Sequence, residues 1–343
     1  MEVNKPFTKD LDKSIADCYK ILLDSKKIAI TTHVNPDGDA IGCELALYFY
    51  ALSKGIGAKI INYSETPYNL LFLDGVDKVE LFDESSESPH RKYIGECDTI
   101  FLVDLNNSSR VKSMSDAILN AKVKKIIIDH HMEPDDMADL YVIDPDSTST
   151  GEIIWKLLKK DSGMKFTPAM ATALYAAIMS DTGSFRFPRT DAETHRIVAE
   201  LIECGADPVD IYEEIYNIIP FEAARLLGEA FAGMEKLFDG RLVLMKLPKE
   251  SFERTGASED DTEGIVEHTV TIKNVMVGVL LIERPGDPQI RISFRSKGDI
   301  NVRDIAVSLG GGGHHHAAGA RISGKSLEEV RRIIIESAGK LFR

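Results

Sequence analysis

Three short apolar runs in the first half of the chain, at 27–30, 100–103 and 124–128, each lead into acidic or histidine residues. Their length and unbroken apolar character are typical of strands buried on both faces of a parallel sheet. Apolar-periodic segments such as 40–52 lie between them and predict helices on both faces of that sheet. A buried core gives no reason for Asp or His at the end of each strand. The carboxyl ends of strands in an open α/β sheet are, however, where ligands bind.

The first of these polar segments places His33, Asp37 and Asp39 in a turn between a predicted strand and a predicted helix. Asn35-Pro36 starts the turn, and Gly38 permits a positive φ between the two carboxylates, so that they converge. The three side chains are then placed as ligands of a hard cation. On this stretch alone, an equally good explanation is that the two acids are helix caps and that the histidine is incidental.

Other acidic and histidine residues follow later elements. Asp104 ends the second apolar run, although it could equally cap the turn that follows. Asp129-His130-His131 ends the third run, and two adjacent imidazoles beside a carboxylate rarely serve packing. Asp181 ends the apolar helical pattern at 168–179 and is followed by a glycine turn. Arg186, close behind it, suits an anionic substrate, with a surface salt bridge as the alternative.

The length of 343 residues suggests two domains. A long helical pattern at 221–238 ends at Asp239-Gly240, and strand-like stretches alternate with shorter helices after it. The sequence therefore predicts a catalytic domain at 1–219, a linker helix at 220–238 and a smaller α/β domain at 239–343.

The second domain contains four consecutive glycines, 310–313, followed by His314. Glycines let backbone N–H groups approach an anion closely, and the imidazole can donate a hydrogen bond to phosphate. Arg291 and Arg295 alternate on a predicted strand nearby in the sequence. The alternative is a flexible glycine loop beside a solvated strand face.

Composition excludes some classes of function. The net charge is 41 minus 55, or -14, which argues against a protein that coats long nucleic acid. The cysteines are far apart, with no C-x-x-C pair, so we expect reduced thiols: Cys18, Cys43, Cys97 and Cys204. The sequence shows no signal-like segment and no apolar run of about 18 residues that would span a membrane, so we expect a cytoplasmic protein.

With these motifs assembled, the chain resembles the DHH phosphoesterase superfamily with its DHHA1 companion domain. The resemblance covers nearly the whole chain, and the motifs occur in the expected order: His33-x-Asn-Pro-Asp37-Gly-Asp39, Asp104, Asp129-His130-His131, Asp181-Thr-Gly-Ser-Phe-Arg and Gly311-Gly-Gly-His314-x-x-Ala-Ala-Gly319. Within the superfamily it is most similar to the stand-alone oligoribonucleases that also dephosphorylate 3′-phosphoadenosine 5′-phosphate (pAp), the NrnA type.

The resemblance implies two divalent cations, usually Mn²⁺, with Mg²⁺ or Co²⁺ as alternatives. One ion would be held by His33, Asp37 and Asp104. The other would be held by Asp39, Asp104, His130 and Asp181. Asp129 would orient a neighbouring ligand, and His131 would contact the scissile phosphate or protonate the leaving oxygen. In the second domain, the substrate would be held by Arg295, His314 and the backbone of Gly311, Gly312 and Gly313.

The resemblance further implies hydrolysis of short RNA or DNA oligonucleotides to mononucleotides and removal of the 3′-phosphate of pAp, with water activated by two metals. Members of the superfamily are often dimers, so the resemblance also implies a possible homodimer. The nearest rival is a cyclic-dinucleotide or linear-dinucleotide phosphodiesterase, followed by a single-strand exonuclease. A pyrophosphatase or polyphosphatase would usually lack the glycine–histidine stretch. A non-catalytic nucleotide-binding regulator would lack some metal ligands, and every expected position is filled here.

Overall fold

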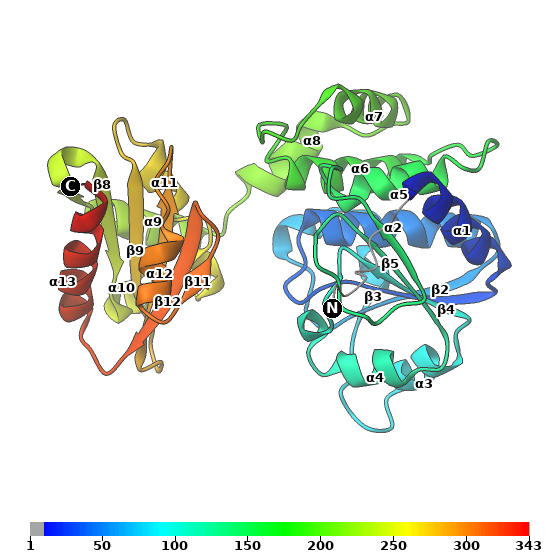
Figure 1. The fold of residues 1–343 in the computed structure, drawn as a ribbon, viewed down its shortest axis with the longest axis horizontal. Coiled ribbons are helices and arrows are strands. Elements are labelled where there is room, and N and C mark those ends of the chain that lie inside the picture. Colours follow the sequence, from blue (N-terminus) through cyan, green and yellow to red (C-terminus); the bar gives the residue numbers. More distant parts are fainter. Residues whose placement is uncertain (1–9, 343) are drawn as a thin grey trace, which may run out of the picture. The chain divides into compact units, whose positions relative to one another are not determined.

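The computed structural model describes residues 10–342 and divides into two compact units, with the boundary after Ile218 (Figure 1). No helix among these described residues is long and apolar enough to cross a membrane.

The first unit is built on a six-stranded sheet in which every neighbouring pair of strands is parallel. Its strands are β1 (Lys27–Thr31), β2 (Gly57–Asn62), β3 (Val79–Leu81), β4 (Thr99–Val103), β5 (Lys124–Asp129) and β6 (Leu140–Ile143). The spatial order is β3-β2-β1-β4-β5-β6, so the chain changes direction across the sheet between β1 and β4. This switch point is the usual ligand position in an open α/β sheet.

Helices cover both faces of this sheet, as predicted. One face is covered by α1 (Leu11–Asp24), α2 (Gly38–Ser53), α5 (Thr150–Leu158) and α6 (Pro168–Asp181). The other face is covered by α3 (Pro89–Glu96) and α4 (Met114–Asn120), and Figure 1 shows the two groups on opposite sides. Side chains alternate along each strand, so Ile28 and Ile30 pack toward α2 while Ala29 packs toward α4. The parallel α/β sheet predicted from the apolar runs is confirmed.

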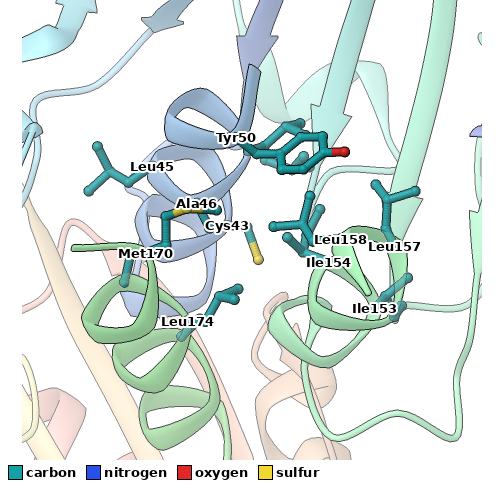
Figure 2. Packing of buried hydrophobic residues seen from close by; sticks show 14 of the residues in the cluster. Cys43, Leu45, Ala46, Tyr50, Ile153, Ile154, Leu157, Leu158, Met170 and Leu174 are labelled. Atoms are coloured by element: carbon teal, nitrogen blue, oxygen red, sulfur yellow. The ribbon is translucent and has the colours of Figure 1, made fainter. Parts of the chain in front are cut away.

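Two short helices follow α6 and complete this unit: α7 (Ala192–Glu203) and α8 (Pro208–Tyr212), the latter continued by a π-helical turn at Glu213–Asn217. Helices α2, α5 and α6 pack closely beneath them, with apolar side chains from all three in one cluster (Figure 2). Gly42 allows the closest approach, because a Cβ there would lie 2.3 Å from the carbonyl oxygen of Ala173 on α6. The position of α2, which carries Asp39, is therefore fixed by packing.

The second unit has a mixed six-stranded sheet. Its strands are β7 (Glu235–Leu237), β8 (Leu242–Leu247), β9 (Val277–Glu283), β10 (Gln289–Ser296), β11 (Gly312–Gly313) and β12 (Ala317–Ser323). The order is β11-β12-β10-β9-β8-β7, and only β8 and β9 pair in parallel. One face is covered by α12 (Arg303–Ser308) and α13 (Leu327–Ala338). The other is partly covered by α9 (Phe221–Ala232), α10 (Lys249–Thr255) and α11 (Glu267–Thr271).

The helix predicted across 221–238 is shorter in the structure. Helix α9 ends at Ala232 with Gly233 as its C-cap, and residues 235–237 pair with β8 as strand β7. Leu226 and Ala230 of α9 are buried against the second sheet, so the helix packs within the second unit. The pattern missed this break because Leu237 and Phe238 continue the apolar spacing beyond the glycine.

Candidate metal centre

The first site residues lie in the loop from β1 to α2. His33 and Asp39 are buried, and Asp37 is the N-cap of α2, its side chain accepting a 3.1 Å hydrogen bond from the backbone N–H of Ala40. The positive φ in this turn belongs to Asn35, at 54°, and not to Gly38 as the sequence suggested. Gly38 is the first residue of the helix, and a Cβ there would lie 2.7 Å from the side chain of Ser180. The glycine is required by helix packing and not by the turn.

Asp39 is held by two residues that are distant from it in the sequence. Its Oδ2 accepts a 2.7 Å hydrogen bond from the backbone N–H of Thr150, and its Oδ1 accepts a 2.9 Å bond from that of Gly151. These two N–H groups belong to the first turn of α5, where backbone donors have no partner within the helix. Neither residue was predicted to belong to the site, although a Ser-Thr-Gly segment at a helix start is a signal for such a donor pair.

Asp104 is the central acid of the site. It follows β4 with a φ of 52°, and its Oδ2 accepts a 3.1 Å hydrogen bond from Nε2 of His33. Its Oδ1 accepts a 3.0 Å bond from the hydroxyl of Thr150 and lies 3.8 Å from Nε2 of His130 and 3.5 Å from Nδ1 of His131. One carboxylate thus contacts polar groups from three separate parts of the chain.

In the Asp129-His130-His131 segment, the side chain of His130 contacts Asp181, whereas that of His131 faces solvent. His130 Nε2 lies 3.0 Å from the Oδ2 of Asp181 at the end of α6. His131 donates from Nδ1 to Oδ1 of Asp129, at 2.8 Å, and its side chain is 47% exposed. The Oδ2 of Asp129 is buried without a hydrogen-bond partner among the described residues. Asp129 therefore orients an imidazole that faces solvent.

The structure places the predicted metal ligands of the first unit in overlapping groups, although Asp104 is not in the group that contains Asp39, His130 and Asp181. There are three groups, and within each group the ligand atoms lie within 4.8 Å of one another. The groups are His33, Asp37 and Asp104; Asp39, His130 and Asp181; and Asp104, Asp129, His130 and His131. Asp104 and His130 each belong to two of these groups. Arg186, which was predicted as a substrate contact and not as a ligand, is exposed, and its Nε donates to the carbonyl oxygen of Gly183.

The site concentrates negative charge in a buried place. Burial raises the pKa of the Asp39 carboxyl, and the neighbouring charges of Asp104 and Asp181 raise it further. Burial also raises the pKa of Asp104, against the hydrogen bond from His33. Burial alone would lower the pKa of His130, but the bond to Asp181 and the charge of Asp39 raise it to about 10. Cations relieve such repulsion, and carboxylate with imidazole is a donor set suited to divalent metals, so these residues fit a metal centre.

In the second unit, the glycine stretch forms an edge of the sheet. Gly312 pairs with Gly319 and Gly313 with Ala318, and a Cβ on Gly311 would lie 2.0 Å from the carbonyl oxygen of Gly319. His314 is exposed beside this edge. Arg295, on β10, pairs with Glu267 at 2.5 Å and donates to the carbonyl oxygen of Phe294.

Comparison with known proteins decides the family. Residues 27–178 match the model of the DHH family, N-terminal domain, and residues 240–340 match that of the DHHA1 domain. A bifunctional oligoribonuclease and PAP phosphatase NrnA from Thermus thermophilus is 31% identical over 312 residues, which cover 90% of this chain and 88% of that protein. The chain belongs to the DHH family. It is therefore a hydrolase that acts on phosphoester bonds, and as a DHH phosphoesterase it uses divalent metals.

Two further proteins extend the comparison. The crystal structure of an exopolyphosphatase-related protein from Bacteroides fragilis superposes with a TM-score of 0.88 at 31% identity, covering 98% of this chain and 99% of that one. The cyclic-di-AMP phosphodiesterase GdpP of Geobacillus thermodenitrificans is 26% identical over 338 residues, which cover 94% of this chain and 49% of that protein.

Proposed function

We propose that this DHH protein hydrolyses short oligonucleotides to mononucleotides and removes the 3′-phosphate of pAp. The observation that carries the proposal is the shared position of Asp104, which belongs to two of the three candidate ligand groups and contacts a histidine of the third. A carboxylate that two ligand groups share would suit two cations held close together. The substrate class is supported by the likeness to the NrnA protein of Thermus thermophilus, whose name states both activities.

Two Mn²⁺ ions fit the donor set best, with Mg²⁺ or Co²⁺ as alternatives. One would be held by His33, Asp37 and Asp104. The other would be held by Asp39, Asp104, His130 and Asp181. When bound, such a pair lowers the pKa of water and neutralises charge on phosphoryl oxygens. The backbone donors at the start of α5 keep Asp39 in place, and they do so without contributing charge of their own.

His131 is the residue we assign to the reacting phosphate. Its side chain is half-exposed while its Nδ1 is bound to Asp129, so Nε2 is free to face a substrate. The carboxylate fixes the tautomer and holds the ring, as in other histidine–carboxylate pairs. The hydrogen bond to Asp129 also raises the pKa of His131. The doubly protonated imidazolium would then donate its Nε2 proton to the leaving oxygen and keep the Nδ1 proton.

The second unit is proposed as the substrate-binding domain. Arg295, His314 and the backbone N–H groups of Gly311, Gly312 and Gly313 would hold a phosphate or the base end of the substrate. This assignment is supported by the exposure of the histidine and by the side-chain-free edge that the glycines form. Arg186 in the first unit would add a positive charge for an anionic substrate.

A panel of substrates tests the proposal. The protein is incubated with Mn²⁺ and, separately, with pAp, a dinucleotide, a 5-mer, a long single strand, pyrophosphate or a cyclic dinucleotide, and initial rates are compared. We expect the highest kcat/KM with pAp and the short oligonucleotides, and no turnover after chelation of the metal. A protein that turned over none of these, or only pyrophosphate, would contradict the proposed function.

A cyclic-dinucleotide phosphodiesterase is the second candidate, favoured by the likeness to GdpP over nearly the whole chain. The same panel distinguishes the two, because this candidate requires the cyclic dinucleotide to be preferred over pAp. A single-strand exonuclease would prefer the long strand. We also propose a cytoplasmic location, supported by the four cysteines, all of which are free and three of which are buried.

A further inference from the structure

Two arginines of the second unit stand directly opposite each other. Arg291 on β10 pairs with Arg321 on β12, and residues paired across an antiparallel ladder point to the same face of the sheet. Like charges in this arrangement destabilise a sheet. Arg291 forms an ion pair with Glu259, but no ion pair involves Arg321 within residues 10–342. The exposed guanidinium of Arg321 therefore adds positive charge with no acid to balance it.

The repulsion extends beyond this pair. Burial lowers the pKa of Arg291, and the charges of Arg321, Arg284 and Arg295 lower it further. The charge of Glu263 acts in the opposite direction, and the carboxylate that Arg291 binds, that of Glu259, is shared with Arg284. Arg284 also pairs with Asp287, and Arg295 pairs with Glu267, so among the described residues Arg321 is the guanidinium of this group without an ion pair. An anion would relieve this repulsion.

Toward β12 and β11, the surface beside the arginine pair is formed by small residues. Ser293 is the next β10 residue on this face; it pairs with Gly319, which pairs in turn with Gly312 of the glycine edge. All three are partly exposed. This row separates Arg291 from Arg295, which lies four residues along the same strand and therefore about 13 Å away between Cα atoms. A flat strip thus joins two positive positions.

We propose that Arg291 and Arg321 form a second phosphate subsite, which binds a backbone phosphate of an oligonucleotide whose end is held near Arg295. The inference rests on the proposed function and specifies the substrate class further. The two phosphates of pAp are attached to one ribose and lie closer together than the two positions. The subsite therefore favours oligonucleotides over pAp, and it makes the second unit sensitive to substrate length.

Affinity measured without turnover tests this subsite. Fluorescence anisotropy with a labelled 5-mer, in chelator and without metal, compares the full-length protein with Arg321→Gln. Arg332→Gln is the matched control, because Arg332 is an exposed arginine of α13, which covers the opposite face of the same sheet. Parallel assays with Mn²⁺ give kcat/KM for pAp and for the 5-mer.

We expect Arg321→Gln to weaken 5-mer binding about 10-fold, as for the removal of one charge-assisted hydrogen bond. The slope of log affinity against log salt should become shallower by about 0.7 for each phosphate that the variant no longer binds. The ratio of kcat/KM for the 5-mer to that for pAp should fall by a similar factor, and the control should match the wild type. Equal binding by Arg321→Gln and wild type, an equal loss for both substrates, or no 5-mer binding by the wild type would each overturn the subsite. Absence of hydrolysis in all variants would refute the proposed function, while the anisotropy comparison would still decide the subsite.

Discussion

The carboxylate of Asp39 accepts a 2.7 Å hydrogen bond from the backbone N–H of Thr150, 111 residues further along the chain. The donor lies at the N-terminal end of α5, where the helix dipole favours a negative charge. Because α2, α5 and α6 pack in one apolar cluster, an acid of one helix is held by the end of another. The geometry of the metal centre therefore depends on core packing as well as on its own residues.

Replacing the shared acid should abolish activity. Asp104→Asn keeps the shape of the side chain but removes the negative charge that two ligand groups share. Loss of an outer partner of a metal ligand typically costs 10- to 100-fold, so loss of a shared ligand should lower kcat/KM by more than about 100-fold. Rates with pAp and Mn²⁺, together with calorimetric Mn²⁺ binding, check this. Near-normal turnover would show that Asp104 is not a ligand.

Removing the partner of His131 should slow the reaction without releasing the metal. Asp129→Asn weakens the 2.8 Å bond that orients the imidazole, so we expect kcat to fall by about 10- to 100-fold with little change in KM. Steady-state kinetics measure the split, and Mn²⁺ titration measures the binding. If KM rose while kcat stayed constant, the histidine would bind substrate and take no part in proton transfer.

A single methyl group at Gly42 should disturb the helix packing that supports the site. Its Cβ would lie 2.3 Å from the backbone oxygen of Ala173, so α2 and α6 must move apart. We expect Gly42→Ala to lower the free energy of unfolding by about 1–3 kcal/mol, the usual cost of overpacking, and to lower activity as well. Urea unfolding followed by circular dichroism measures the change.

Gly228→Ala is the matched control for that substitution. Gly228 also lies inside a helix, α9, but a Cβ there would meet nothing within 4 Å. The same change should therefore raise the free energy of unfolding by about 0.5–1 kcal/mol, because alanine restricts the unfolded chain. Equal effects of the two substitutions would mean that close packing at Gly42 is unimportant.

The buried acid Glu44 should make stability depend on pH. Burial raises its pKa from 4.5 to about 8, and the hydrogen bond from Asn62 offsets only part of this effect. Between these two values the folded protein holds a proton that the unfolded chain has released. The contribution of Glu44 to stability is therefore fully present below pH 4.5 and is lost as pH rises toward 8.

Glu44→Gln removes this dependence, since glutamine does not titrate. The free energy of unfolding of the variant, relative to the wild type, should increase between pH 5 and pH 8.5 by on the order of 3–5 kcal/mol. Denaturant titrations at both pH values, in chelator, measure the difference. Glu203→Gln, at an exposed site on α7, should show no such change. A constant difference for Glu44→Gln would mean that its pKa is not raised.

The sequence by itself determined the sheet and the set of polar residues at its edge. Local pattern was sufficient for this, because a buried parallel strand must be apolar over its whole length, and Asp104 and Asp129 come at or directly after the ends of such runs. The order of the motifs also carried the family resemblance. The short strands β3 and β7 were not predicted, because three residues contain too little periodicity to distinguish a strand from a turn.

Only the tertiary structure decided which groups meet. The hydrogen bond from Thr150 to Asp39 depends on how α5 packs against α2. The pairing of Arg291 with Arg321 depends on the register between β10 and β12. The role of Gly38 could not be predicted from its local sequence either. The glycine is needed for close packing against Ser180, 142 positions further along the chain, and not for the adjacent turn. Packing and register are set by the shapes of surfaces that are distant in sequence, so no local pattern specifies them.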